Sequence, residues 1–322
     1  MMLAAILAAL IAQSAPSDGA LFRDPVHDGA ADAAIVREAG TGTWLMFYTN
    51  RRADLPVAEG DVSWVHGTRI GIAESGDGGA TWTYRGTADL PVDAPTHWAP
   101  EIVSDNGLNH LFLSVVPGVF RDWNAPRAIV HLTSPDLRVW TYHSRLDLGS
   151  DRVIDAGVLP LPGGGWRMWY KDERDGSRIH HADSPDLYTW TPRGVALDGP
   201  PGEGPKPFAW RGRYWMVVDH WNGLGVYRSE DAEHWQAQPG RLLAEPGHRP
   251  TDRAKGQHAD VVVVGDRAYL VYFTQQDGAP ETALDPTWRR RSVIHAAALT
   301  ETDGLLSVDR DQPVTLDLGS PR

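Results

Sequence analysis

The sequence contains no cysteine among its 322 residues, and its basic side chains are outnumbered. The missing cysteine excludes disulfide bonds, thiolate nucleophiles, cysteine-ligated zinc, iron–sulfur clusters and a lipoprotein anchor. The 30 Lys and Arg against 42 Asp and Glu give a net charge of −12 at pH 7. Wrapping a nucleic acid or an anionic membrane requires a basic face, so neither is an expected partner. A neutral or cationic small molecule is the expected partner.

Long apolar runs are also scarce, and the one strongly apolar stretch is Met1 to Ala12. It is too short to span a bilayer, and the small residues Ala12-Gln13-Ser14 that follow resemble a cleavage site. We interpret residues 1–14 as a signal peptide and expect export to the periplasm or the cell exterior, with no membrane span. The segment has no Lys or Arg, which leaves a plain apolar N-terminal segment as the alternative.

Turn-forming and aromatic residues are abundant, with 33 Gly, 24 Pro and 14 Trp. Four segments share a Ser-x-Asp turn followed by Trp, and each is preceded by two short runs of β-branched and aromatic residues. A fifth unit lacks the turn, as a terminal repeat often does. Repeats of this length predict an all-β, single-domain, five-bladed β-propeller over residues 20–318. We expect a structural role for the Ser-x-Asp…Trp turns and place the blades at 20–85, 97–142, 152–192, 203–237 and 256–300.

The start of each repeat carries a carboxylate or a histidine, and the innermost strands of a propeller converge on its channel. Carboxylates that converge there push one another's pKa values apart, so that one remains protonated as an acid while another is ionised as a base. Hydrolysis of a glycosidic bond requires such a pair. The segments are Arg23-Asp24-Pro25, Trp98-Ala99-Pro100-Glu101, Ile154-Asp155-Ala156, Glu203-Gly204-Pro205 and Gln257-His258.

In their order and phasing these five segments resemble the motifs of family 43 glycoside hydrolases. That family consists of inverting five-bladed propellers that act mostly on arabinofuranosides and β-xylosides. The resemblance implies that Asp24 is the general base, Glu203 the general acid, and Asp155 the residue that keeps the acid protonated; Ala156 stands where the family often has Pro. The structural alternatives are an Asx turn before Pro25 for Asp24 and a polar loop position for Glu203.

Four further residues are candidates for binding. Trp98 is expected either to stack on a sugar ring or to lie in the core. Glu101 is expected to bind sugar hydroxyls or to pair with Arg291, which the resemblance places near the site. His258 stands where many family members hold a channel metal, often calcium, through a histidine and waters; the alternative is a core histidine, since calcium prefers oxygen ligands.

The predicted function is the hydrolysis of terminal glycosidic bonds in plant-type oligosaccharides. Two long loops, 51–67 and 117–126, are expected to rim the channel and to favour exo action. Three alternatives stay open: a non-catalytic carbohydrate-binding propeller, an interaction scaffold, and a sialidase-like hydrolase, whose Asp-box pattern fits Ser75 to Trp82.

Overall fold

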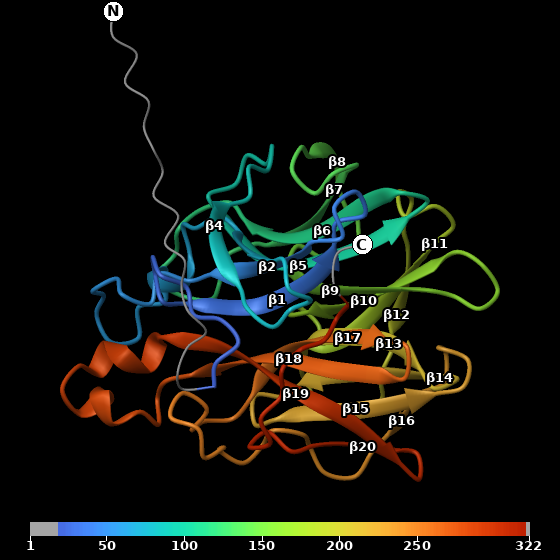
Figure 1. Cartoon of the computed structure of the whole chain (residues 1–322). Coiled ribbons are helices and arrows are strands. Elements are labelled where there is room, and N and C mark those ends of the chain that lie inside the picture. Colours follow the sequence, from blue (N-terminus) through green and yellow to red (C-terminus); the bar gives the residue numbers. More distant parts are fainter. Residues whose placement is uncertain (1–18, 320–322) are drawn as a thin grey trace, which may run out of the picture.

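The computed structural model describes residues 19–319 and shows five four-stranded antiparallel sheets arranged as the blades of a propeller (Figure 1). The predicted single-domain, five-bladed β-propeller is confirmed, whereas the predicted signal peptide, residues 1–14, lies outside the described residues. The fifth blade extends past the predicted residue 300 to Val308. The blades contain, in order: β1 (Ala30–Arg37), β2 (Trp44–Asn50), β3 (Gly71–Ser75) and β4 (Thr83–Thr87); β5 (Thr96–Asp105), β6 (Leu108–Val116), β7 (Ala128–Ser134) and β8 (Thr141–Arg145); β9 (Val153–Pro160), β10 (Trp166–Asp172), β11 (Arg178–Ser184) and β12 (Thr191–Val195); β13 (Glu203–Trp210), β14 (Arg213–Asp219), β15 (Leu224–Ser229) and β16 (Gln236–Ala237); β17 (Gln257–Val264), β18 (Arg267–Gln275), β19 (Ser292–Thr302) and β20 (Leu305–Val308).

The position of a strand within its blade follows from its composition. The second strands β2, β6, β10 and β14 are rich in aromatic and β-branched residues and are mostly buried. The fourth strands β4, β8 and β12 are polar and mostly exposed. Strands that are covered by neighbouring blades on both faces lose the polar alternation of a half-solvated sheet. The apolar strands therefore form the interior of the propeller, and the polar strands form its rim.

The Ser-x-Asp…Trp turns have the structural role that the sequence predicts. In the second blade the Asp136 carboxylate accepts the backbone amides of Arg138 and Val139, which fixes the turn. The Trp that follows packs on the preceding blade: Trp140 lies 6.1 Å from Phe47, measured between ring centroids. The same contact recurs between Trp190 and Phe112 at 5.4 Å and between Trp235 and Trp169 at 5.7 Å. Each turn therefore fastens one blade to the next.

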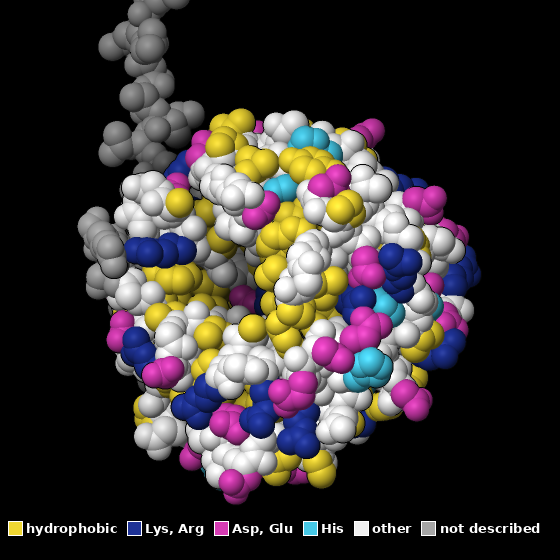
Figure 2. Space-filling model, turned by 90° about the vertical axis from the view of Figure 1, so that its right-hand side faces the viewer, with side chains coloured by type: hydrophobic (Ala, Val, Ile, Leu, Met, Phe, Trp, Pro, Cys, Tyr) yellow, Lys and Arg dark blue, Asp and Glu magenta, His cyan; other side chains and the backbone are white. Residues whose placement is uncertain are grey.

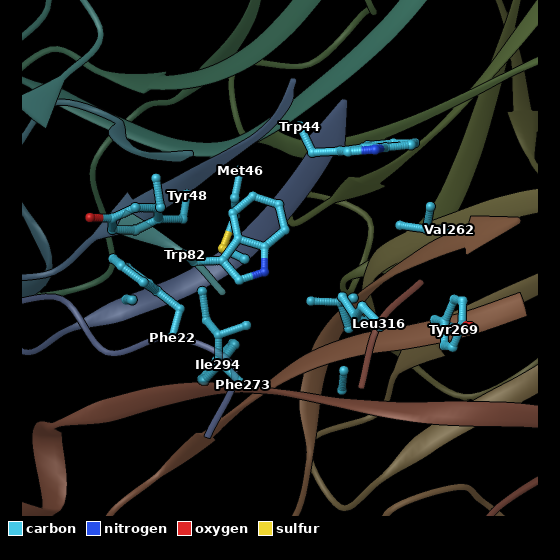
Figure 3. Close-up of a cluster of buried hydrophobic side chains, with 14 of the residues drawn as sticks. Phe22, Trp44, Met46, Tyr48, Trp82, Val262, Tyr269, Phe273, Ile294 and Leu316 are labelled. Atoms are coloured by element: carbon cyan, nitrogen blue, oxygen red, sulfur yellow. The ribbon is translucent and has the colours of Figure 1, made fainter. Parts of the chain in front are cut away.

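Closure of the ring depends on contacts between the first and last blades, because every sheet is made of consecutive strands. Phe22 pairs with Ile294 of β19 through backbone hydrogen bonds. A buried apolar cluster fills the same junction (Figure 3), in which Trp82, Phe273 and Leu316 come from blade 1, blade 5 and the C-terminal segment. The C-terminal segment thus completes the core between these blades.

One face of the molecule is hollowed near its middle, and hydrophobic side chains gather around the hollow (Figure 2). Charged side chains on this face lie mostly further out. Within residues 19–319 we find no helix with the length and hydrophobicity needed to cross a membrane.

Candidate active site

The first strand of each blade, which is the innermost, contains a residue with positive φ near its start. In all five blades the pairing of this strand with the second strand shifts register beside that residue. A bulge of this kind bends a strand and redirects its side chains, and it is common beside binding sites. Non-glycine residues rarely adopt positive φ, so four of these positions store backbone strain. The residues are Asp32 (φ 48°), Ala99 (41°), Asp155 (61°), Gly204 (57°) and His258 (22°).

These irregularities bring charged side chains from several blades to one cavity of about 350 Å³. This volume lies within the range of small-molecule sites, which are concave and contain a few convergent polar groups. Its carboxylates are Asp32, Asp155, Glu173 and Glu203, and its cations are Arg51, Arg127, Lys171 and His258. The lining also includes Trp98, Trp123, Trp221 and Phe273.

Asp24, the residue that the sequence suggested as the general base, is not among the residues that line this cavity. Its carboxylate is buried, and Oδ1 accepts the backbone amides of Val26 and His27 at 2.9 and 2.6 Å. Oδ2 accepts the Tyr48 hydroxyl at 2.6 Å and the Asn50 amide at 3.1 Å. This is the Asx turn of the structural alternative, with its acceptor sites already used. These contacts favour the structural alternative over a general base at Asp24.

Asp32 of β1 occupies the corresponding place in the first blade, at the bulge and in the cavity lining. Its Oδ1 lies 3.3 Å from Nδ1 of His258. A signal for it was present in the sequence: Asp32-Ala33 repeats the pair Asp155-Ala156. Asp32 precedes the second strand of its blade by 12 residues and Asp155 does so by 11, whereas Asp24 does so by 20.

Glu203 stands at the start of β13 and forms an ion pair with Lys171 of β10. Burial alone would raise the pKa of Glu203, but the Lys171 ammonium donates a 2.9 Å hydrogen bond to Oε2 and holds this pKa below its ordinary value. Lys171 also lies 3.2 Å from Glu173, which accepts a hydrogen bond from Arg127 at 3.1 Å. Glu203 is thus anchored in a network that reaches from blade 4 to blade 2.

Asp155 is buried, and burial together with the nearby Glu203 raises its pKa to about 7, against the opposing effect of His258. Its Oδ2 accepts the backbone amide of Gly204 at 3.2 Å. The sequence predicted that Asp155 keeps Glu203 protonated. In this structure the Lys171 contact reverses the order, so that the proton of this carboxyl pair resides preferentially on Asp155.

His258 lines the cavity and contacts Asp32. Burial alone would lower its pKa, but the surrounding carboxylates, Asp32 first, raise it. Within residues 19–319, no group of three or more His, Cys, Asp or Glu side chains is arranged to hold a metal ion. Calcium takes six to eight oxygen ligands, so this side-chain set does not fit a calcium held directly by the protein.

Of the other three predicted site residues, one lines the cavity and two do not. Trp98 lines the cavity and is largely buried, and its Nε1 donates to the Val65 carbonyl at 2.7 Å. Glu101 and Arg291 do not line it. Glu101 pairs with Lys206 at 2.7 Å, and Arg291 pairs with Asp28 at 2.6 Å. The predicted pairing of Glu101 with Arg291 is wrong, because each has a nearer partner of opposite charge.

Both long loops reach the cavity. Val65 comes from loop 51–67 and Trp123 from loop 117–126, and the Trp123 ring lies 6.3 Å from that of Trp98. Lys171, Arg127 and Arg51 were missed by the sequence reasoning. Their positions within, directly before or directly after strands gave no signal, because contacts across blades are not visible in one sequence.

No protein-family model and no curated protein sequence matches this chain. Solved structures do resemble it. A thermostable family-43 glycoside hydrolase superposes with a TM-score of 0.68 at 17% identity, covering 94% of this chain and 99% of the other. An exo-1,5-α-L-arabinanase from a bovine ruminal metagenomic library gives 0.60 at 17% identity, covering 87% and 96%. A β-1,3-galactosidase of the same family, bound to galactodeoxynojirimycin, gives 0.63 at 14% identity, covering 87% and 93%.

These comparisons define the class of architecture, the five-bladed propeller. Within that class, the solved structures that the chain resembles are family-43 glycoside hydrolases. The likeness extends over nearly the whole described chain, and at this level of identity it shows a shared fold.

Proposed function

We propose that this protein is a glycoside hydrolase that cleaves terminal glycosidic bonds with inversion. The observation that carries the proposal is the convergence of Asp32, Asp155 and Glu203 in one cavity of a propeller with the family-43 fold. Buried carboxylates are unfavourable unless they are paired, liganded or used in chemistry. Acid–base cleavage of a glycoside requires two of them with different protonation states.

Asp32 is the proposed general base, which accepts a proton from the water that attacks the anomeric carbon. Glu203 is the proposed general acid, which donates a proton to the departing oxygen. An inverting enzyme keeps these two carboxyl groups roughly 6.5–9.5 Å apart to admit the water. Asp155 is a positioning residue that shares a proton with Glu203. When the leaving group of the substrate binds beside Glu203, on the side where Lys171 lies, the proton is expected to move from Asp155 to Glu203.

His258 is the proposed positioning residue for the base. Its imidazole lies against Asp32 Oδ1, and its backbone amide donates to Asp219 Oδ2 at 3.0 Å. Burial, reinforced by Glu203, raises the pKa of Asp219 to about 6. These contacts link the proposed base, the histidine and Asp219 across blades 1, 4 and 5.

The proposed substrates are the non-reducing ends of plant-type oligosaccharides, of the α-L-arabinofuranoside or β-D-xyloside type. Two observations support exo action: both long loops reach the cavity, and structurally similar proteins include an exo-arabinanase. We also propose that the protein is exported, on the strength of the N-terminal sequence alone.

The test is the hydrolysis of a panel of aryl arabinofuranosides, xylosides and galactosides by the full chain and three variants. Asp32→Asn and Glu203→Gln are each expected to lower kcat/KM by about 10²–10⁴-fold, because each removes one partner of acid–base catalysis. Asp24→Asn is the matched control, and it is expected to retain turnover even where it lowers stability.

Loss of turnover in Asp24→Asn with retention in Asp32→Asn would restore the base to Asp24. The rival function, a carbohydrate-binding propeller without catalysis, predicts no turnover in any form of the protein. In that case binding of the same sugars would be unaffected by Glu203→Gln.

A further inference from the structure

Arg51 follows directly after β2, and its backbone is held in one position. Its amide donates to the Gly29 carbonyl at 3.0 Å. A Cβ on Gly29 would lie 1.9 Å from the Arg51 carbonyl oxygen, so only glycine permits this approach. The side chain is therefore projected into the cavity from a fixed point.

The guanidinium of Arg51 is held between two aromatic rings. Its Cζ lies 4.6 Å from the centroid of Phe273 and 5.5 Å from that of Trp64. Such stacking leaves the edge of the planar group, with its N–H donors, free to bind an acceptor. Nε and Nη2 are buried and have no hydrogen-bond partner among the described residues. Buried donors without acceptors destabilise a fold, and here the burial lowers the pKa of Arg51.

The other cations that line the cavity all have carboxylate partners. Arg127 pairs with Glu173 at 3.1 Å, Lys171 with Glu203 at 2.9 Å, and His258 with Asp32 at 3.3 Å. In the part of the chain that the structure describes, Arg51 forms no ion pair. The cavity therefore contains one oriented guanidinium whose buried N–H groups have no acceptor, although the nearby Asp32 and Glu203 raise its pKa against the effect of burial.

We propose that Arg51 recognises a carboxylate on the substrate, so that the sugar bound in this cavity is a uronic acid. The inference rests on the proposed function, the hydrolysis of terminal glycosides, and assigns it a sugar with a carboxylate in place of an arabinofuranoside or a xyloside. A guanidinium matches a carboxylate with two parallel hydrogen bonds, which are stronger than bonds to a neutral hydroxyl. The net charge of −12 favoured a neutral or cationic ligand, but recognition at contact distance is decided by local groups, here the buried guanidinium donors that have no acceptor.

The test measures binding by calorimetry of two matched pairs of free sugars, D-glucuronate with D-glucose and D-galacturonate with D-galactose. For at least one pair, the intact protein is expected to bind the uronate at least tenfold more tightly than the neutral sugar. Arg51→Gln is expected to abolish this preference. Arg51→Lys is expected to retain only part of it, since lysine keeps the positive charge but lacks the two parallel N–H donors of the guanidinium.

Arg121→Gln is the matched control, because Arg121 is in loop 117–126 and its side chain is 87% exposed. This variant loses the same charge and is expected to keep the preference. Circular dichroism of each variant establishes that it is folded. The proposal is overturned if the intact protein shows no uronate preference, or if the preference persists in folded Arg51→Gln.

The outcomes separate this inference from the proposed function. Hydrolysis of neutral glycosides with no uronate preference would overturn the role of Arg51 and leave the hydrolase standing. Uronate binding that depends on Arg51, with no turnover of aryl glucuronides or of any neutral glycoside, would overturn the hydrolase and leave the ligand class standing.

Discussion

At the scale of single residues, the electrostatics around Glu203 decide how the proposed acid works. Lys171 stabilises the ionised form of Glu203, while burial favours the protonated form of Asp155. In this arrangement the catalytic proton is held on Asp155 and not on Glu203, the group that donates it to the leaving oxygen. The fraction of Glu203 that is protonated therefore falls as pH rises, and it falls earlier than it would without Lys171.

Lys171→Met tests this relation. Removing the ammonium takes away the largest effect that lowers the pKa of Glu203, whereas burial still raises this pKa and the smaller effects of His258 and Trp221 still lower it. Activity that needs protonated Glu203 is lost as pH rises through that pKa. The alkaline limb of the kcat/KM profile is therefore expected to move to higher pH in Lys171→Met.

Arg174→Met provides the comparison for Lys171→Met, since Arg174 is exposed and pairs with Asp151. Its profile is expected to match that of the parent. An unshifted alkaline limb in Lys171→Met would show that Glu203 does not limit activity at high pH.

Site residues could be predicted from the sequence where a motif stands at the start of a strand. They could not be predicted where the direction of the side chain depends on the register between two strands. Asp155 and Glu203 were located correctly within the cavity lining, as was His258. The sequence analysis named Asp24 for the first blade and did not consider Asp32, because Asp-Pro is a more conspicuous motif than Asp-Ala. The bulge that turns Asp32 inward is a property of backbone register, which a motif does not record.

At the scale of elements, the bulges in the innermost strands position the site. Gly204 shows how tightly they fit: it has φ +57°, and a Cβ there would lie 2.6 Å from Cδ2 of His258. The imidazole thus occupies the space that any other residue would need. The contact between His258 and Asp32 depends on a glycine in another blade.

Gly204→Ala is expected to displace the His258 ring and to lower kcat/KM by at least tenfold, because the support of the proposed base is lost. Gly212→Ala is a matched control: φ is +76°, but nothing lies within 4 Å of its added Cβ. Both substitutions introduce the strain of positive φ, about 1 kcal/mol, and only Gly204→Ala should impair turnover. Equal activity of the two variants would show that His258 does not support the reaction.

Strands and turns were predictable from one sequence because their determinants are local. Runs such as Trp44 to Tyr48 indicate buried strands, and Asp136 fixes its turn through backbone amides only two and three residues away. The ion pair of Lys171 and Glu203 joins residues 32 positions apart on separate blades. Pairings of that kind require the angle between blades, which no local pattern specifies.

At the scale of the whole molecule, stability depends on how the ring closes. No strand of blade 1 completes the sheet of blade 5. Closure instead uses the pairing of Phe22 with Ile294 and the packing of the C-terminal segment, where the Leu318 amide donates to the Gly78 carbonyl at 2.8 Å. Because a few backbone pairs and one apolar cluster close this propeller, its stability is expected to be sensitive to substitutions at the junction of blades 1 and 5.

Substitution of Leu316 tests whether the C-terminal segment stabilises the closed ring. Its side chain is 2% exposed and lies in the cluster between blades 1 and 5 (Figure 3). Leu316→Ala removes buried methyl groups and leaves a cavity, so the free energy of unfolding is expected to fall by about 2–5 kcal/mol. Leu284→Ala removes the same atoms from a side chain that is 93% exposed and is expected to change it by no more than about 0.5 kcal/mol. Urea denaturation measures both, and equal midpoints would mean that the C-terminal segment does not hold the ring closed.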